Sequence, residues 1–157
     1  LGWVDTLPAW SPGAKKIAFF RYNYIAGEDF DGGPQGLWWY DVASGEASLL
    51  YEMPIVTEDL PPVWSPNGKH LAFLEPMDGE HVLRVLDVKS GELLGIGSVL
   101  GDKRTITWSP DSRALAFTNL GEERIAMYIL DIGSGELTEV LETEPGASIG
   151  DPDWGGN

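Results

Sequence analysis

The sequence predicts an all-β fold made from a repeated four-stranded unit, because two sequence blocks recur in a fixed order. The first block is Trp-Ser-Pro followed by turn residues and an apolar stretch, and it begins at Trp10, Trp64 and Trp108. The second block is Asp-x-x-Ser-Gly-Glu, and it begins at Asp41, Asp87 and Asp131. Both blocks occur three times in the same order, which predicts three copies of one structural unit.

The two sequence blocks of each copy predict two β-hairpins. Proline and Asn, Asp or Gly in the first block turn the first strand into the second. In the second block, glycine supplies the positive φ that turns the third strand into the fourth. The expected third strands are Leu37–Val42, Val82–Val88 and Ile125–Ile132. The expected fourth strands are Ala47–Tyr51, Leu93–Val99 and Leu137–Leu141. Four short antiparallel strands every ~44 residues are typical of a β-propeller blade.

We therefore predict a single β-propeller segment over residues 1–157. Its blades cover about 5–52, 59–100 and 103–142, and the first strand of a fourth blade covers 150–157. The repeated tryptophans are expected to pack between neighbouring blades, and they are Trp10, Trp64, Trp108 and Trp154. Three blades cannot close a ring. Either the chain belongs to a longer propeller, which we favour, or copies of it assemble into one ring.

The pattern Trp-Ser-Pro-Asp-Gly-Lys…Ile-Ala-Phe, followed by Asp-x-x-Ser-Gly-Glu, resembles the TolB-type (WD40-like) β-propeller repeat. Similar repeats occur in the propeller domains of prolyl-oligopeptidase-like and tricorn-like peptidases. The resemblance covers nearly the whole chain. It implies a noncatalytic scaffold that binds a protein or peptide, in the periplasm or outside the cell. It also leaves two alternatives, a propeller domain that gates a separate serine peptidase domain and a structural subunit of a larger complex.

Composition limits the partners and the chemistry. The net charge of -15 repels nucleic-acid phosphates and anionic lipids, so we expect no nucleic acid and favour basic protein or peptide surfaces. No apolar run reaches the ~18–20 residues that cross a bilayer, so we expect no membrane insertion. The chain has no cysteine, which excludes disulfides and thiolate metal sites. No motif indicates a cofactor.

Propeller geometry predicts two faces of different charge. Basic residues are expected at the turns between first and second strands, and they are Lys15, Lys16, Lys69 and Arg113. Acidic residues are expected in the loops of the opposite face. They are Glu28, Asp29, Asp31, Glu52, Glu58, Asp59, Asp78, Glu80, Asp102, Glu122, Glu123, Glu142, Glu144 and Asp151. This acidic face is a candidate for binding cationic partners, although acidic loops also serve solubility.

The insertion in the first copy is the candidate binding site, because a loop that departs from a repeat often carries function. Its aromatic and acidic side chains suit a sugar, a peptide or an amine, or simply form a longer hairpin. The candidate ligand-binding residues are Tyr22, Tyr24, Glu28, Asp29, Asp31 and Trp38. Asp29 and Asp31, before Gly32, are also a weak calcium candidate, because the later ligands of a calcium loop are missing.

No catalytic constellation is visible, and we expect no enzyme activity. Gly146–Gly150 matches the string G-x-S-x-G, but it lacks the following helix of a nucleophile elbow. His70 and His81 are the only histidines, and we interpret both as structural or surface residues.

Overall fold

The computed structural model describes residues 3–23, 34–53, 60–77, 80–94, 102–120, 125–143 and 154. These residues form twelve strands in three separate four-stranded sheets, and each sheet is antiparallel with its strands in chain order. The all-β prediction of three repeated blades is therefore confirmed. We call the sheets the first, second and third blade. No helix long and apolar enough to cross a bilayer occurs among the described residues.

The strands lie close to their predicted positions. The first blade comprises β1 (Trp3–Trp10), β2 (Lys16–Asn23), β3 (Gly36–Asp41) and β4 (Glu46–Glu52). The second comprises β5 (Val63–Trp64), β6 (His70–Met77), β7 (Glu80–Asp87) and β8 (Leu93–Leu94). The third comprises β9 (Asp102–Trp108), β10 (Ala114–Leu120), β11 (Ile125–Asp131) and β12 (Leu137–Glu142). The predicted continuation of β8 to Val99 lies outside the described residues.

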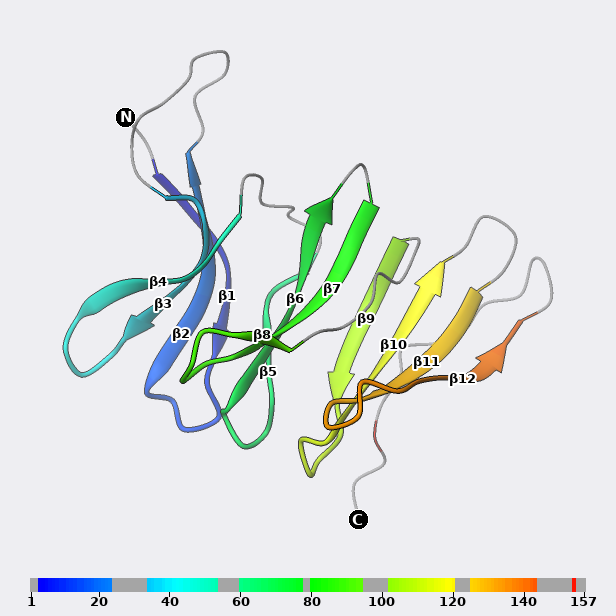
Figure 1. The fold of residues 1–157 in the computed structure, drawn as a ribbon. Helices are drawn as coiled ribbons and strands as arrows, with labels where there is room; N and C mark the ends of the chain where they lie inside the picture. Colours follow the sequence, from blue (N-terminus) through cyan, green and yellow to red (C-terminus); the bar gives the residue numbers. More distant parts are fainter. Residues whose placement is uncertain are drawn as a thin grey trace.

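The three blades stand side by side, with the two hairpin turns of each blade at one edge (Figure 1). The first strands of neighbouring blades contact each other, β1 with β5 and β5 with β9. Each blade therefore presents one face to its predecessor and the other face to its successor. We call these the incoming face and the outgoing face.

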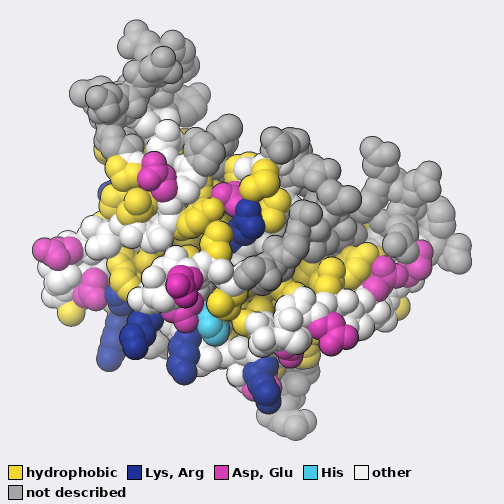
Figure 2. Space-filling model, viewed as in Figure 1, with side chains coloured by type: hydrophobic (Ala, Val, Ile, Leu, Met, Phe, Trp, Pro, Cys, Tyr) yellow, Lys and Arg dark blue, Asp and Glu magenta, His cyan; other side chains and the backbone are white. Residues whose placement is uncertain are grey.

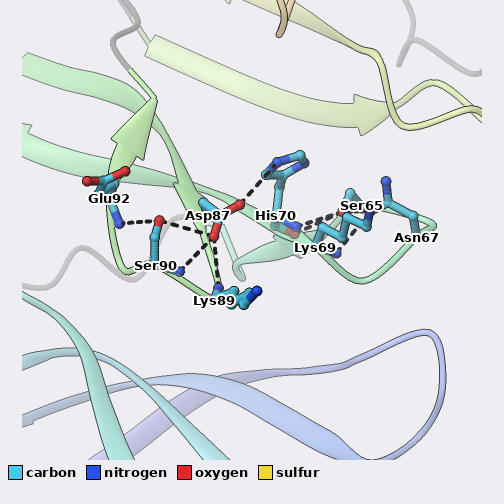
Figure 3. A network of polar contacts seen from close by, with 8 residues as sticks. All are labelled: Ser65, Asn67, Lys69, His70, Asp87, Lys89, Ser90 and Glu92. Atoms are coloured by element: carbon cyan, nitrogen blue, oxygen red, sulfur yellow. Dashed lines mark hydrogen bonds and ion pairs between the residues drawn. The ribbon is translucent and has the colours of Figure 1, made fainter.

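The residues of the two repeated blocks hold the turns in shape. In the second blade, Ser65 Oγ accepts a hydrogen bond from the His70 main-chain N–H (2.9 Å). Asp87 Oδ1 accepts the main-chain N–H groups of Lys89 and Ser90 at 2.9 and 2.8 Å (Figure 3). The equivalent serines and aspartates of the other blades cap their turns in the same way. The repeated motif is therefore a device for building turns.

Glycine is required at two kinds of position. The glycine of each Ser-Gly-Glu turn has φ between 72° and 74°, a left-handed conformation that side chains disfavour. Gly36, which opens β3, has φ 143°, and a Cβ there would collide with the main-chain oxygen of Tyr51 on β4. The close approach of β3 and β4 at this point depends on the missing side chain.

Two apolar cores fill the spaces between the blades. The first joins the outgoing face of the first blade to the incoming face of the second. Its fully or nearly buried members are Ala18, Phe20, Leu37, Met53, Trp64, Leu71, Phe73 and Leu86. The second joins the second and third blades in the same manner, and it contains Ala72, Leu74, Leu83, Val85, Ile106, Trp108, Leu115, Phe117 and Leu130. The blades are held together mainly by this apolar burial.

The charge pattern only partly follows the predicted division. Lys15, Lys69 and Arg113 lie in turns between first and second strands, while Lys16 is the first residue of β2. Figure 2 shows Lys and Arg side chains along the lower edge. Carboxylates of the Asp-x-x-Ser-Gly-Glu turns share the turn edge, and Lys16 pairs with Asp41 at 3.7 Å. The edge is therefore mixed in charge.

Some of the acids predicted for the opposite loops lie in strands instead. Glu52 and Glu142 end β4 and β12, while Glu80 and Asp102 begin β7 and β9. These four strands extend to charged residues that were expected in loops, because those residues keep the ladder pairing at the strand ends. The other acids of that predicted set lie outside the described residues.

Candidate functional site

The incoming face of the first blade has no blade packed against it among the described residues, and we call it the open face. Strand pairing brings its residues together, because Trp10 pairs with Ile17 and Phe19 pairs with Trp38. Residues that alternate along β2 and β3 share one side of the sheet. The open face therefore carries Trp10, Ile17, Phe19, Arg21, Trp38 and Tyr40.

The open face is the exposed counterpart of surfaces that are buried elsewhere in the chain. Trp10 is 58% exposed, whereas the equivalent Trp64 and Trp108 are 9% and 6% exposed. Tyr40 is 38% exposed, whereas its equivalents on β7 and β11, Leu86 and Leu130, are fully or nearly buried. Among the described residues, the open face is thus an interblade type of surface that no blade covers.

A pocket of about 390 Å³ lies on this face. It is bounded by the apolar side chains of Pro8, Ile17 and Phe19, together with Tyr40 and Arg21. A concave, mostly apolar site with a few polar groups is what a bound side chain or ligand requires.

Arg21 supplies the positive charge of the open face. Its Nε donates to Asp5 Oδ1 at 2.6 Å and its Nη2 donates to Asp5 Oδ2 at 2.7 Å, a bidentate pair. The hydrogen bond to Asp5 is the main cause that raises the pKa of Arg21, against the opposing effect of burial. The guanidinium carbon also lies 4.8 Å from the centroid of the Trp38 ring and 5.3 Å from that of Phe19. Arg21 is therefore held in a fixed position over two aromatic rings.

The buried interfaces show how an incoming face makes polar contacts. Trp64 Nε1 donates to the main-chain oxygen of Ala9 (3.1 Å), and Trp108 Nε1 donates to that of Val63 (3.0 Å). Each acceptor is the residue immediately before the tryptophan of the preceding blade. Trp154 Nε1 likewise donates to the main-chain oxygen of Thr107 (3.4 Å), which precedes Trp108. Trp64 and Trp108 lie in the two cores between the blades, whereas no blade faces Trp10 among the described residues.

A second polar contact joins the first and second blades. Glu75, which is 6% exposed, accepts a hydrogen bond from the Tyr51 hydroxyl (3.0 Å) of the first blade. It also accepts one from Arg84 Nε at 2.6 Å. Burial and then the Glu75 carboxylate raise the pKa of Tyr51. Glu75 and Arg21 are equivalent in the repeat, each two residues after the phenylalanine of the first block.

The structure does not bring the predicted binding residues into one site. Trp38 lies on the open face, but Tyr22 lies on the opposite side of β2, because it follows Arg21 directly along the strand. The other predicted members, Tyr24, Glu28, Asp29 and Asp31, lie outside the described residues. The weak calcium candidate lies outside them too, and no group of three His, Asp or Glu suited to a metal occurs in the described ranges.

The remaining motifs do not form a catalytic site in the described part of the chain. His70 pairs with Asp87 across the hairpin, and His81 pairs with Pro76 near the other end of the same hairpin. The segment Gly146–Gly150 is outside the described residues.

Sequence reasoning missed Asp5 and Arg21. The available signal was the position two residues after the repeated phenylalanine. It holds Arg21, Glu75 and Asn119 in the three blades, so its charge changes while its surroundings are repeated.

Solved structures that resemble the chain identify its fold. No protein-family model and no curated protein sequence matches the chain. Among solved structures, TolB from Acinetobacter baumannii matches 87% of this chain with a TM-score of 0.65 and 23% identity. The β-propeller domain of the Trilobed protease from Pyrococcus furiosus matches 90%, with a TM-score of 0.65 and 19% identity. The chain carries three blades of a β-propeller.

A third solved structure extends the same likeness. The acylaminoacyl peptidase from Pyrococcus horikoshii matches 91% of this propeller segment, with a TM-score of 0.66 and 15% identity. The segment covers 32% of TolB, 43% of the Trilobed protease domain and 26% of the peptidase. It therefore spans less than half the length of each of these structures.

Proposed function

We propose that the chain is a noncatalytic β-propeller module that binds a protein or peptide, and that it binds through the open face. The observation that carries this proposal is the exposure of Trp10 and Tyr40 at positions that are buried in the next two blades. Exposed apolar surface of this kind marks interaction sites. Aromatic and arginine side chains are also the residues that contribute most at protein interfaces.

The chemistry of the open face suits a polypeptide. Its pocket accepts an apolar side chain, and Arg21 offers further N–H donors beyond the two used by Asp5. A polypeptide supplies both apolar groups and main-chain carbonyl oxygens. The net charge of -15 favours encounter with basic partners, because long-range attraction acts before contact.

The resemblance to TolB-type repeats supports a periplasmic or extracellular location as part of this proposal. It also supports a second candidate function, a propeller domain that gates a serine peptidase. The observation that favours this alternative is the likeness to propellers of the Trilobed protease and of acylaminoacyl peptidase. An α/β-hydrolase domain with its own serine, aspartate and histidine, encoded in the same reading frame, would decide for the alternative. A structural subunit of a larger complex is the third candidate.

Selection of displayed random peptides tests the binding proposal. Tyr40→Glu changes an exposed residue on the open face, and Val140→Glu changes a similarly exposed residue on β12. Peptides selected on the unaltered chain should bind Tyr40→Glu at least tenfold more weakly and Val140→Glu within twofold. Circular dichroism should show both variants folded. Selected peptides that bind both variants equally, or the absence of any selected peptide, would contradict the proposal.

A further inference from the structure

We propose that His70 is an acid-sensitive contact between the second and third blades, and that uptake of a proton by its ring loosens this interface. The interface between the first and second blades stays closed in the same pH range. This device lies away from the open face and goes beyond the proposed binding function.

His70 lies at the boundary between two blades. It opens β6 and shares the outgoing side of the second blade with Ala72, a member of the core between the second and third blades. Its ring stacks on that of Trp108, with centroids 5.8 Å apart and planes inclined by 16°. Trp108 in turn donates its indole N–H to the Val63 oxygen of the second blade. The imidazole therefore packs on the tryptophan that joins the third blade to the second.

The two ring nitrogens of His70 have different surroundings. Nε2 lies 3.8 Å from Asp87 Oδ2 across the hairpin, which is too long for a hydrogen bond (Figure 3). Nδ1 is buried and has no hydrogen-bond partner among the described residues. A neutral imidazole carries one N–H, so Nδ1 can remain a bare acceptor. The protonated ring carries an N–H on both nitrogens, and a buried donor without an acceptor is costly.

The charged groups around His70 do not offset this cost. Asp87 favours the protonated ring and the adjacent Lys69 disfavours it, while β9 of the third blade presents an uncharged indole. The charged residues in the neighbouring turn of the third blade, Asp111 and Arg113, act on each other. Burial outweighs the attraction of Asp87, so the pKa of His70 lies below its ordinary 6.5. The closed interface therefore disfavours a proton that an opened interface accepts.

Histidine at this position is particular to one interface. The equivalent residues are Lys16 in the first blade and Ala114 in the third. The Lys16 ammonium lies 2.9 Å from the centroid of the Trp39 ring in its own blade and 3.7 Å from Asp41 Oδ2. A lysine ammonium keeps its charge throughout mild acid, and alanine does not titrate. The interface between the first and second blades is thus an internal reference for the histidine.

Protonation of His70 has a direct structural consequence. Attraction between the imidazolium and the indole face opposes a change, but it leaves the Nδ1 donor without an acceptor. Rotation of the ring away from Trp108 lets both N–H groups reach water and brings the cation toward Asp87. The rotation removes the stacked contact and uncovers the indole. Protonation is thereby linked to opening of the interface between the second and third blades.

Indole hydrogen exchange at two pH values tests the proposal. Protection of the Trp108 indole N–H, measured against free tryptophan at the same pH, should fall at least about tenfold between about pH 7.5 and about pH 5.5. Protection of Trp64, at the interface between the first and second blades, should change by less than about twofold over the same range. Equal losses at the two tryptophans, or no loss at Trp108, would overturn the proposal.

Two histidine variants assign the response. His70→Gln should abolish the acid-induced loss at Trp108, because glutamine takes up no proton. His81→Gln is the matched control, since it removes the other histidine of the β6–β7 hairpin, and it should retain the loss. A loss that survives His70→Gln would contradict the assignment. Proton NMR titration of the His70 ring in the unaltered chain tests the same point if His70→Gln does not fold. A midpoint at or above 6.5 would overturn the proposal.

Discussion

Replacement of Trp108 by alanine should lower the free energy of unfolding by about 4 kcal/mol. The Trp108 side chain is 6% exposed within the core between the second and third blades. Truncation of such a side chain removes its contacts and leaves a cavity, at a cost of about 3–5 kcal/mol. Trp108→Phe keeps most of the apolar contact and removes the hydrogen bond to the Val63 oxygen. It should cost about 1–2 kcal/mol, because that buried carbonyl loses its partner.

Trp10→Ala is the matched control, since it changes the same repeat position on the open face. It should cost less than about 1 kcal/mol, as expected for a side chain that is largely exposed. Urea unfolding followed by far-ultraviolet circular dichroism measures all three variants without relying on the fluorescence of the replaced residue. Equal losses for Trp10→Ala and Trp108→Ala would refute the division into a covered and an open tryptophan.

Three further predictions concern the turn, the polar contact and the pH response. Gly36→Ala should destabilise the fold by about 2–4 kcal/mol in the same urea assay, because the added Cβ collides with β4. Gly13→Ala is its control and should change stability by less than about 1 kcal/mol, because a Cβ there meets no atom within 4 Å. Glu75→Ala should cost about 3–5 kcal/mol, because it leaves Arg84 half-buried without its carboxylate, and a loss below 1 kcal/mol would contradict the contact. Burial lowers the pKa of His70 from its ordinary 6.5, so the unfolded chain binds this proton more readily than the folded chain. Stability should fall as pH drops from 6.5 toward the lower folded pKa, and His70→Gln should flatten that slope in a pH series of thermal unfolding.

The repeat made the fold predictable from sequence. Turn residues are local signals, and the same Asp and Ser side chains that mark the pattern also cap the turns, as Asp87 and Ser65 do. The packing role of the tryptophans was predictable for the same reason, because a residue repeated in every blade meets a structural requirement that all blades share. Interblade packing is that common requirement, and Trp64 and Trp108 meet it.

The candidate site was harder to predict, because it depends on which side of a sheet each residue faces. Tyr22 and Trp38 are both aromatic and both flank the insertion, yet strand alternation places them on opposite sides of the first blade. The open face also has no motif of its own, because the same repeat positions form the covered faces of the second and third blades. Trp10 looks identical to Trp64 in the sequence, and only the arrangement of blades separates the exposed indole from the buried one.

Functional information lies where the repeat varies. The position that holds Arg21 in the first blade and Glu75 in the second reverses its charge, although both lie beside the repeated phenylalanine. Each charge is balanced by a different neighbour, Asp5 within the same blade or Arg84 and Tyr51 around Glu75. Among the described residues, the position contributes a contact between blades only at Glu75, which accepts the Tyr51 hydroxyl.

Hydrogen exchange at the indole N–H groups shows whether a neighbouring blade covers each repeated tryptophan. Nitrogen-15 NMR resolves these protons, and single Trp→Phe variants assign them. We expect slow exchange for Trp64 and Trp108, whose indole N–H groups donate to carbonyl oxygens of the neighbouring blade, and fast exchange for Trp10. Slow exchange at all three positions, or fast exchange at Trp64 and Trp108, would contradict it.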